Sequence, residues 1–293
     1  MGQTPIMRRY QAEDHVKLEQ LIAILETDDS TLQTASFAAI DSEFPNHNPA
    51  IDRFVIEAAD QIIGYAWIAG DRPDRTDCWL CVAPEHRRKG HGGQLLKRIL
   101  ERASQRQATG LMAYLPGKKP ALEFANRTGF EVKGYFRELH LPAKTQRKSA
   151  MLPNGWRLEP YSESLDVDRY AQILDASYAD LWGHGIASPE VMQIVLSTLE
   201  SQDTFLVVDA GGQDVGCAGM TRGNPQRIAA PGLISTQRSS QNYQAVLANA
   251  LNKLEPEFEV ILNSWGESDE TIAAYLELGF VVGERTAIAS RAV

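Results

Sequence analysis

The chain has 293 residues, which suggests two domains at about 150 residues per domain. Hydrophobic residues make up 43% and charged residues 23%, as in ordinary soluble globular proteins, so disordered, collagen-like and fibrous chains are excluded. The net charge of −9 argues against a whole-sequence attraction to nucleic acid or to anionic lipid.

The predicted elements of the first half mix strands and helices in an order typical of an α+β fold. Strands are expected near 5–10, 53–58, 62–69, 77–83, 110–115 and 130–140, and helices near 12–26, 32–44, 92–107 and 119–128. Hairpins together with one or two crossovers imply a mixed sheet with helices packed on it.

The boundary between the halves is expected at residues 141–155, which contain prolines and basic residues without a sustained apolar period. This linker would separate a domain at 1–140 from a second domain at 156–293. Beyond it, Thr204–Asp209 and Val215–Met220 are predicted as strands around a Gly-Gly turn.

The second half repeats the first at an offset of 150 or 151 residues. Gly129-Phe130 recurs as Gly279-Phe280. An apolar helical stripe recurs as well: Leu95, Leu96, Ile99, Leu100 and Ala103 correspond to Val246, Leu247, Ala250, Leu251 and Leu254. Two helices that bury the same face indicate an internal duplication.

A glycine-rich loop follows the strand at 77–83 and opens the striped helix of the first half. Gly90, Gly92 and Gly93 lack a Cβ, so the backbone can turn tightly and bring several N–H groups to one ligand. The helix that follows directs its unsatisfied N–H groups the same way. Residues 87–89 add three positive charges, and a pyrophosphate suits this combination best.

This segment resembles motif A of the GNAT superfamily of N-acetyltransferases, Val-x-Pro-x-x-Arg-x-x-Gly-x-Gly. Its fixed positions are filled by Val82, Pro84, Arg87, Gly90 and Gly92. The family's Ala-x-x-Phe-Tyr-x-Lys-x-Gly-Phe segment is matched by Ala121, Phe124, Arg127 in place of Lys, Gly129 and Phe130. The resemblance implies two tandem GNAT-like domains, each a mixed, splayed and mainly antiparallel sheet flanked by helices. The layout is similar to that of mycothiol synthases.

The resemblance also implies that the first domain binds acetyl-CoA as a co-substrate, with the pyrophosphate on the loop and the pantetheine along the preceding strand. The expected cofactor-binding residues are Leu80, Cys81, Val82, Arg87, Arg88, Lys89, Gly90, His91, Gly92 and Gly93. In the second half, Gly90, Gly92 and Gly93 become Gln241, Tyr243 and Gln244. Such side chains would block the approach of phosphate to the backbone, so the second domain is expected to keep the fold but not CoA binding.

Acyl transfer to an amine needs a base near neutral pH, because alkyl amines have a pKa of about 10. Asp77 is the first candidate and Glu123 the second; the alternatives are a surface charge at a hairpin end and a solvated helix face. The Tyr that often protonates the leaving thiolate in the family is Ala125 here. Tyr114 is the candidate replacement, although it could be a half-buried sheet residue.

Two other features are expected to be structural. Cys78 and Cys81 lie three residues apart on a strand and therefore point to opposite faces, so core thiols are expected and no metal site. In the second domain, Tyr275 occupies the position of the tyrosine that acts as the general acid in the family. It is expected to pack in the core.

The charges of the halves differ and suggest the acceptor. Residues 1–150 hold 21 Lys+Arg and 19 Asp+Glu, whereas residues 151–293 hold 8 and 19, a net charge of −11. A small cationic amine would be attracted to the acidic half. Without an apolar stretch or a disulfide framework, the expected location is the cytoplasm, and no nucleic-acid or membrane partner is expected.

The sequence thus predicts an acetyl-CoA-dependent N-acetyltransferase that acts on a small, cationic amine. The alternative is an acyl-CoA-binding sensor or interaction protein without catalytic activity. The oligomeric state stays open.

Overall fold

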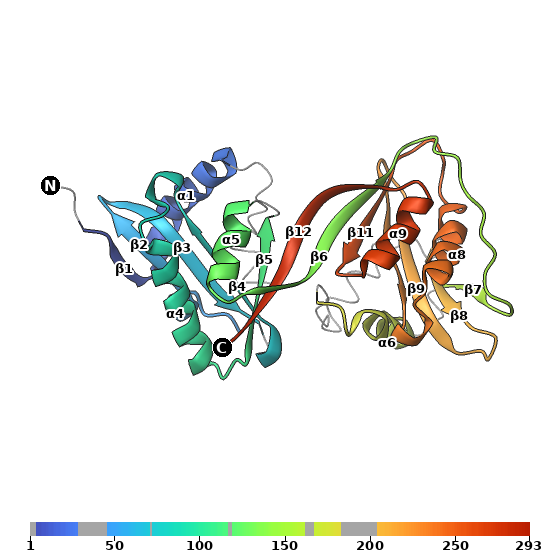
Figure 1. Ribbon diagram of the computed structural model, residues 1–293, viewed down its shortest axis with the longest axis horizontal. Helices are drawn as coiled ribbons and strands as arrows, with labels where there is room; N and C mark the ends of the chain where they lie inside the picture. Colours follow the sequence, from blue (N-terminus) through green and yellow to red (C-terminus); the bar gives the residue numbers. More distant parts are fainter. Residues whose placement is uncertain (1–3, 29–45, 71, 117–118, 162–166, 183–203) are drawn as a thin grey trace. The chain divides into compact units, whose positions relative to one another are not determined.

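The computed structural model describes residues 4–28, 46–70, 72–116, 119–161, 167–182 and 204–293. The chain divides into two compact units: unit 1 contains residues 1–132 and 287–293, and unit 2 contains residues 133–286. Each unit is a mixed, mainly antiparallel sheet flanked by helices, as the sequence predicted (Figure 1).

Unit 1 follows the predicted order of elements closely. Across its sheet the strands are β1 (Ile6–Arg9), β2 (Arg53–Ala58), β3 (Gln61–Ala69), β4 (Thr76–Val82), β5 (Gly110–Pro116) and the end of β12 (Val281–Ala292). Its helices are α1 (His15–Asp28), α3 (Pro49–Asp52), α4 (His91–Gln105) and α5 (Lys119–Arg127). The short α3 was not predicted, although Asn48 caps it and Pro49 starts it. The helix predicted near 32–44 lies outside the described residues.

The two faces of the unit 1 sheet are buried by different helices. The stripe of α4, which includes Leu95, Ile99 and Ala103, packs with apolar residues of β2, β3 and β5 in one core cluster. On the other face, Leu18 and Leu21 of α1 pack in a second cluster with strand residues. Spacings of three and four residues place each set on one side of its helix, so the sheet is covered on both faces.

The sheet of unit 1 opens between β4 and β5. These parallel strands pair at Thr76–Leu111 and Asp77–Met112 and then diverge. By contrast, β4 stays in regular antiparallel register with β3 from Asp77 to Val82. The backbone of β4 beyond Asp77 therefore has one edge facing a gap, as expected for a splayed sheet.

Unit 2 has the same order of elements. Its strands, in order across the sheet, are β7 (Arg157–Pro160), β8 (Phe205–Val208), β9 (Asp214–Thr221), β10 (Gln226–Leu233), β11 (Val260–Trp265) and β6 (Glu131–Leu141). Its helices are α6 (Val167–Tyr178), α8 (Ser240–Leu251) and α9 (Asp269–Glu277). The parallel strands β10 and β11 pair from Gln226–Val260 to Ile228–Leu262 and then diverge. This correspondence supports an internal duplication.

The sixth strand of each unit comes from the other half of the sequence. From Lys133 onward β6 belongs to unit 2, where it pairs antiparallel with β11. Residues 287–293 belong to unit 1, where Ala289 lies in the core cluster beneath α4 and the Val293 N–H donates to the Thr109 carbonyl at 3.3 Å.

This exchange differs from the predicted division at 1–140, 141–155 and 156–293. Residues 133–140 lie in unit 2, and residues 287–293 lie in unit 1. The predicted linker does run without a helix or strand from Pro142 to Trp156. Apolar alternation reveals that a strand exists but not which sheet it completes, so the sequence pattern did not reveal the exchange.

Candidate functional site

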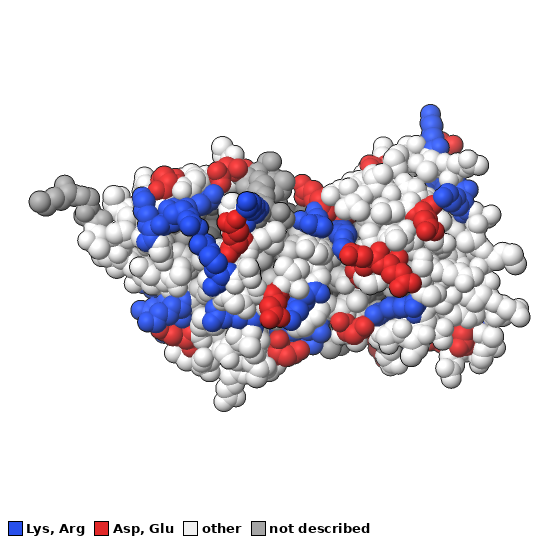
Figure 2. All heavy atoms as spheres, in the orientation of Figure 1, with Lys and Arg blue, Asp and Glu red and all other residues white. Residues whose placement is uncertain are grey.

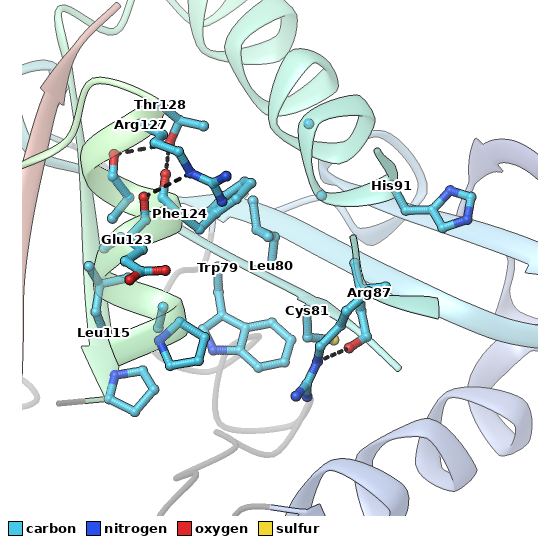
Figure 3. A pocket seen from close by; sticks show the side chains of 18 of the residues that line it. Trp79, Leu80, Cys81, Arg87, His91, Leu115, Glu123, Phe124, Arg127 and Thr128 are labelled. Atoms are coloured by element: carbon cyan, nitrogen blue, oxygen red, sulfur yellow. Dashed lines mark hydrogen bonds between the residues drawn. The ribbon is translucent and has the colours of Figure 1, made fainter. Parts of the chain in front are cut away.

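A groove of about 790 Å³ lies in unit 1 where β4 and β5 diverge (Figure 3). Its walls are the edge of β4 from Cys78 to Val82, residues 113–116 of β5, one face of α5 and the loop before α4. This volume falls in the upper part of the range for small-molecule sites, about 300–1,000 Å³. The gap in the sheet is therefore a binding groove of ligand size.

The loop at 84–90 leads into α4 with its backbone exposed to this groove. Arg88 and Gly90 have positive φ angles of 64° and 89°. No side chain among the described residues caps α4, and its first helical bond runs from the Gln94 N–H to the Gly90 carbonyl at 3.1 Å. The amides of residues 91–93 consequently have no acceptor within the helix.

The three glycines differ in what a side chain would meet. A Cβ at Gly90 or Gly93 would have no atom of the described structure within 4 Å, whereas at Gly92 it would lie 3.2 Å from the Phe124 ring. The space over Gly90 and Gly93 is open, and at Gly92 the phenyl ring of α5 approaches the backbone. An anion could therefore reach the helix N-terminus.

Arg87 anchors the loop with its guanidinium. Its Nε donates to the Val82 carbonyl at 3.0 Å, and its Nη1 contacts the Asp28 carboxylate at 2.8 Å. The loop is thereby tied both to the end of β4 and to the end of α1.

The other basic residues of the loop differ in position. Arg88 lines the groove, whereas the Lys89 ammonium donates to the Glu85 carbonyl at 2.9 Å and lies outside the lining. All other residues that the sequence predicted to bind the cofactor line this groove: Leu80, Cys81, Val82, Arg87, Arg88, Gly90, His91, Gly92 and Gly93.

His91 supplies a buried polar atom beside these amides. The residue is 8% exposed, and its Nδ1 has no hydrogen-bond partner within the described part of the chain. A buried polar atom without a partner is usually satisfied by a ligand or an ordered water. Together with the open space over the glycines, it fits a phosphate-containing group at this point.

The predicted catalytic residues lie in different places. Tyr114 lines the groove and is 40% exposed. Asp77 lies outside the lining, at the last pair of β4 with β5, opposite Met112. Because its strand alternates, Asp77 shares a face with Trp79 and Cys81, which pack on the α1 side of the sheet.

Glu123 and Asp28 are the acidic residues among those that line the groove. Asp28 is paired with Arg87, as described above. The Glu123 carboxylate extends from α5 toward Trp79 (Figure 3) and lies 3.9 Å from the Lys119 ammonium, with its side chain 53% exposed. The sequence spacing already indicates that Glu123 shares one face of its helix with other residues that line the groove: Pro120, Phe124 and Arg127.

The thiols of β4 are buried and free. Cys78 belongs to the core cluster under α4 and Cys81 to the cluster under α1, so they point to opposite faces as predicted. Burial raises the pKa of Cys81 to about 12, which keeps it a thiol near neutral pH. In the ranges that the structure describes, no three His, Cys, Asp or Glu side chains gather as a metal site. No helix in those ranges is long and apolar enough to cross a membrane.

Unit 2 has large buried side chains at the positions that correspond to the groove residues Gly92 and Ala125. Tyr243 and Tyr275, at the positions of Gly92 and Ala125, are 1% and 0% exposed, and their ring centroids lie 5.9 Å apart. Ser239 caps α8 by accepting a hydrogen bond from the Asn242 N–H at 3.1 Å. One amide at the N-terminus of this helix is thus bonded to a side chain of the protein itself.

The arginine anchor is nevertheless present in both units. Arg238, at the position of Arg87, donates from Nε to the Leu233 carbonyl at 2.9 Å and pairs with Asp180 at 2.7 Å. Asp180 follows α6 as Asp28 ends α1. An arginine kept where the glycines are lost has a structural role in holding the loop.

Glu267 is a buried carboxylate in unit 2. It is 5% exposed and accepts a hydrogen bond from the Trp265 N–H. Burial raises its pKa above the ordinary value for Glu, because the charged form is poorly solvated there.

Comparisons with known proteins show what part of the first unit is similar to. Residues 50–132 match the family model of the acetyltransferase (GNAT) domain. This segment contains β2 to β5, the loop, α4 and α5, so it includes the whole groove except its α1 residues. No curated protein matches the sequence significantly.

Solved structures share the fold over nearly the whole chain. A GCN5-related N-acetyltransferase from Sphaerobacter thermophilus is 17% identical with a TM-score of 0.69, covering 98% of this chain and 95% of that one. A tandem GNAT protein from the clavulanic acid biosynthesis pathway is 19% identical with a TM-score of 0.57, covering 99% and 98%. An acetyltransferase structure from Pyrococcus horikoshii is 13% identical with a TM-score of 0.56, covering 99% and 90%. At these identities the likeness concerns the fold.

Proposed function

Because the chain carries a domain of the GNAT acetyltransferase family, we propose that it is an N-acetyltransferase whose unit 1 binds acetyl-CoA and transfers the acetyl group to an amine. The observation that supports this best is the uncapped N-terminus of α4, which opens onto a groove of ligand size. Helix N-termini with free amides are suited to phosphate.

The residues of unit 1 would hold the parts of this co-substrate separately. The amides of residues 91–93 and the Arg88 side chain would bind the pyrophosphate. The open edge of β4 from Leu80 to Val82 would pair with the amide groups of the pantetheine arm. Arg87 would fix the loop rather than contact the phosphates, because its guanidinium already bonds to Val82 and Asp28.

The reaction needs two proton transfers. A bond forms between the amine nitrogen and the thioester carbon while the carbon–sulfur bond breaks. We assign the proton lost by the amine to Glu123, which lines the groove, whereas Asp77 could receive it only through an intervening water. Tyr114 is the hydroxyl that we assign as proton donor to the leaving thiolate.

A small cationic amine is the acceptor class that we propose. Figure 2 shows Lys and Arg gathered over unit 1 on the visible face, which suits an anionic co-substrate better than a cationic one. The attraction for a cation would come from Glu123 in the groove and from the net charge of −11 in residues 151–293. A preference for neutral or anionic acceptors in steady-state kinetics would contradict this assignment.

Unit 2 is proposed not to bind CoA. Tyr243 and Tyr275 are buried at the positions of Gly92 and Ala125, and the Ser239 side chain caps α8.

Calorimetry with acetyl-CoA tests the proposal. We expect one bound acetyl-CoA per chain in the wild type and at least about 100-fold weaker binding in Gly92→Val, because the new side chain would meet Phe124 and cover the amides. Tyr243→Phe is the matched control in unit 2 and should bind like the wild type. Equal affinity in the wild type and Gly92→Val would refute the binding site.

An acyl-CoA sensor without catalytic activity is the second candidate. The observation in its favour is Ala125, which stands where the family often has the tyrosine that protonates the leaving thiolate. Release of free CoA from acetyl-CoA with a panel of amines separates the two functions. Tight binding without turnover on any amine would favour the sensor.

A further inference from the structure

The closed end of the unit 1 groove has an apolar floor. It is formed by Cys78 of β4, Ala113 of β5, Ala125 of α5 and Phe130, which follows α5. All four are less than one-tenth exposed and belong to the same core cluster. The groove therefore ends against apolar side chains.

This floor lies where the acyl group of a bound donor would end, a step that rests on the proposed function. The phosphate loop stands at the end of β4 after Val82, and the gap closes at the pair Asp77–Met112. Cys78 and Ala113 are the first residues beyond that closure. A chain held at the loop and running along β4 past Leu80 would direct its far end onto them.

Unit 2 shows that the same fold can fill this place with large side chains. Tyr275 stands at the position of Ala125 and Tyr243 at that of Gly92, and both are almost fully buried in the unit 2 core. In unit 1 a methyl group and a hydrogen replace the two phenol rings. The Phe124 ring takes up part of this space, since it would lie 3.2 Å from a Cβ at Gly92, and Ala125 lines the groove.

We propose that this floor accepts straight aliphatic acyl chains longer than acetyl, so that unit 1 also uses longer acyl-CoA thioesters as donors. Each additional methylene buried on the floor is expected to strengthen donor binding about fourfold until the floor is reached.

The test is a series of acetyl-, propionyl-, butyryl- and hexanoyl-CoA, measured by calorimetry and by kcat/KM with one amine on the full chain. In the wild type we expect affinity to rise along the series. In Ala125→Phe the ratio of hexanoyl to acetyl affinity should fall at least about tenfold, because the ring occupies the floor. Unit 2 has a ring at the corresponding position, Tyr275, beside Ala274 in place of Phe124.

Two further variants keep the test decisive. Ala113→Val narrows the floor from β5, where a β-branched residue suits the strand, and should also lower the ratio of hexanoyl to acetyl affinity. This variant provides the test if Ala125→Phe fails to fold. Ala125→Tyr should lower the ratio of hexanoyl to acetyl affinity as much as Ala125→Phe does, because both rings occupy the floor. A pH profile of kcat/KM that changes only in Ala125→Tyr would be an effect of the hydroxyl and not of the ring.

The outcomes distinguish this inference from the function on which it rests. If CoA binds but the propionyl, butyryl and hexanoyl thioesters bind no more tightly than acetyl-CoA, the inference is overturned and the proposed function is left intact. A ratio unchanged in folded Ala125→Phe and Ala113→Val would also overturn it. Failure of CoA to bind at all would overturn both.

Discussion

Units 1 and 2 have the same order of strands and the same loop anchor, yet they treat the gap in the sheet in opposite ways. In unit 1 the gap is an open groove beside an uncapped helix N-terminus. In unit 2 the buried Tyr243 and Tyr275 stand at the positions of Gly92 and Ala125, and Ser239 caps the helix. The two halves of one chain thus present an open and a filled version of one architecture.

This difference separates residues that build the fold from residues that serve the groove. Arg87 and Arg238 make equivalent bonds in both units, so the arginine belongs to the fold. Gly92, Ala125 and Glu123 have the counterparts Tyr243, Tyr275 and Ala273, so these positions changed while the fold was kept. The positions that differ are those we assign to ligand binding.

The largest effect is expected from removing the exchanged strand of unit 1. Ending the chain after Thr286 deletes Ile288 and Ala289, both fully buried, together with the edge partner of β5. The loss exceeds what a domain of marginal stability can tolerate, so acyl-CoA binding and the cooperative unfolding of unit 1 should both disappear. Calorimetry and hydrogen exchange check this. The matched control removes only Val293, which is 42% exposed, and should behave like the full chain.

The next largest effect is expected from changing Glu123, the groove carboxylate that has no counterpart in unit 2. Glu123→Gln should lower kcat/KM for the amine by about 100-fold or more, since general base catalysis contributes effects of that size. Asp77→Asn should cost less, because Asp77 lies outside the groove lining. The pH profiles of kcat/KM for both variants decide the assignment. A larger loss in Asp77→Asn would return the role of base to Asp77.

The two anchoring arginines should respond differently to the same substitution. Arg87→Gln removes the bonds to Val82 and Asp28, so the loop loosens and acyl-CoA binding should weaken about tenfold. Arg238→Gln should leave that affinity unchanged and lower the free energy of unfolding by about 2 kcal/mol, because its side chain is only 16% exposed. Calorimetry and urea unfolding measure the two quantities. If Arg238→Gln weakened acyl-CoA binding as much, the division of roles would be wrong.

The smallest effect concerns the buried carboxylate of unit 2. The folded pKa of Glu267 is raised above its unfolded value, so the stability present at a pH below the unfolded value is lost as pH rises through the folded pKa. Glu267→Gln does not titrate. It should match the wild type at pH 4 and be more stable than the wild type at pH 7.5.

Urea unfolding at several pH values measures this difference, with the exposed Glu270→Gln as the control. The control should show no such dependence on pH. A wild type that gained stability relative to Glu267→Gln between pH 4 and pH 7.5 would contradict the raised pKa.

Much of the first unit could be predicted from local patterns. The apolar period of α4 and the alternation of β4 are properties of short segments, and so are the glycines of the loop. Those patterns also predicted correctly that Cys78 and Cys81 face opposite sides of the sheet. For the same reason, the groove lining at Leu80 to Val82 could be anticipated from the motif.

Features that depend on distant segments could not be predicted in this way. Whether Asp77 reaches the groove depends on where β4 and β5 part, which is a property of the pair and not of either strand. The strand exchange of β6 and β12 has the same character, since a strand with a suitable apolar face can complete either sheet. Lys89 turned back to the Glu85 carbonyl because loop backbone geometry, not charge, directs its side chain.

The exchanged strand also constrains how this protein can be made. Residues 287–292 leave the ribosome only after the whole of unit 2, so β5 has an open edge during most of translation. Nascent domains usually fold in order of synthesis, and an unpaired edge invites pairing with other chains. Here the lobe that begins first is finished last. A gene split between the halves would yield two products that each lack the sixth strand of their own sheet. The two halves therefore have to be encoded together.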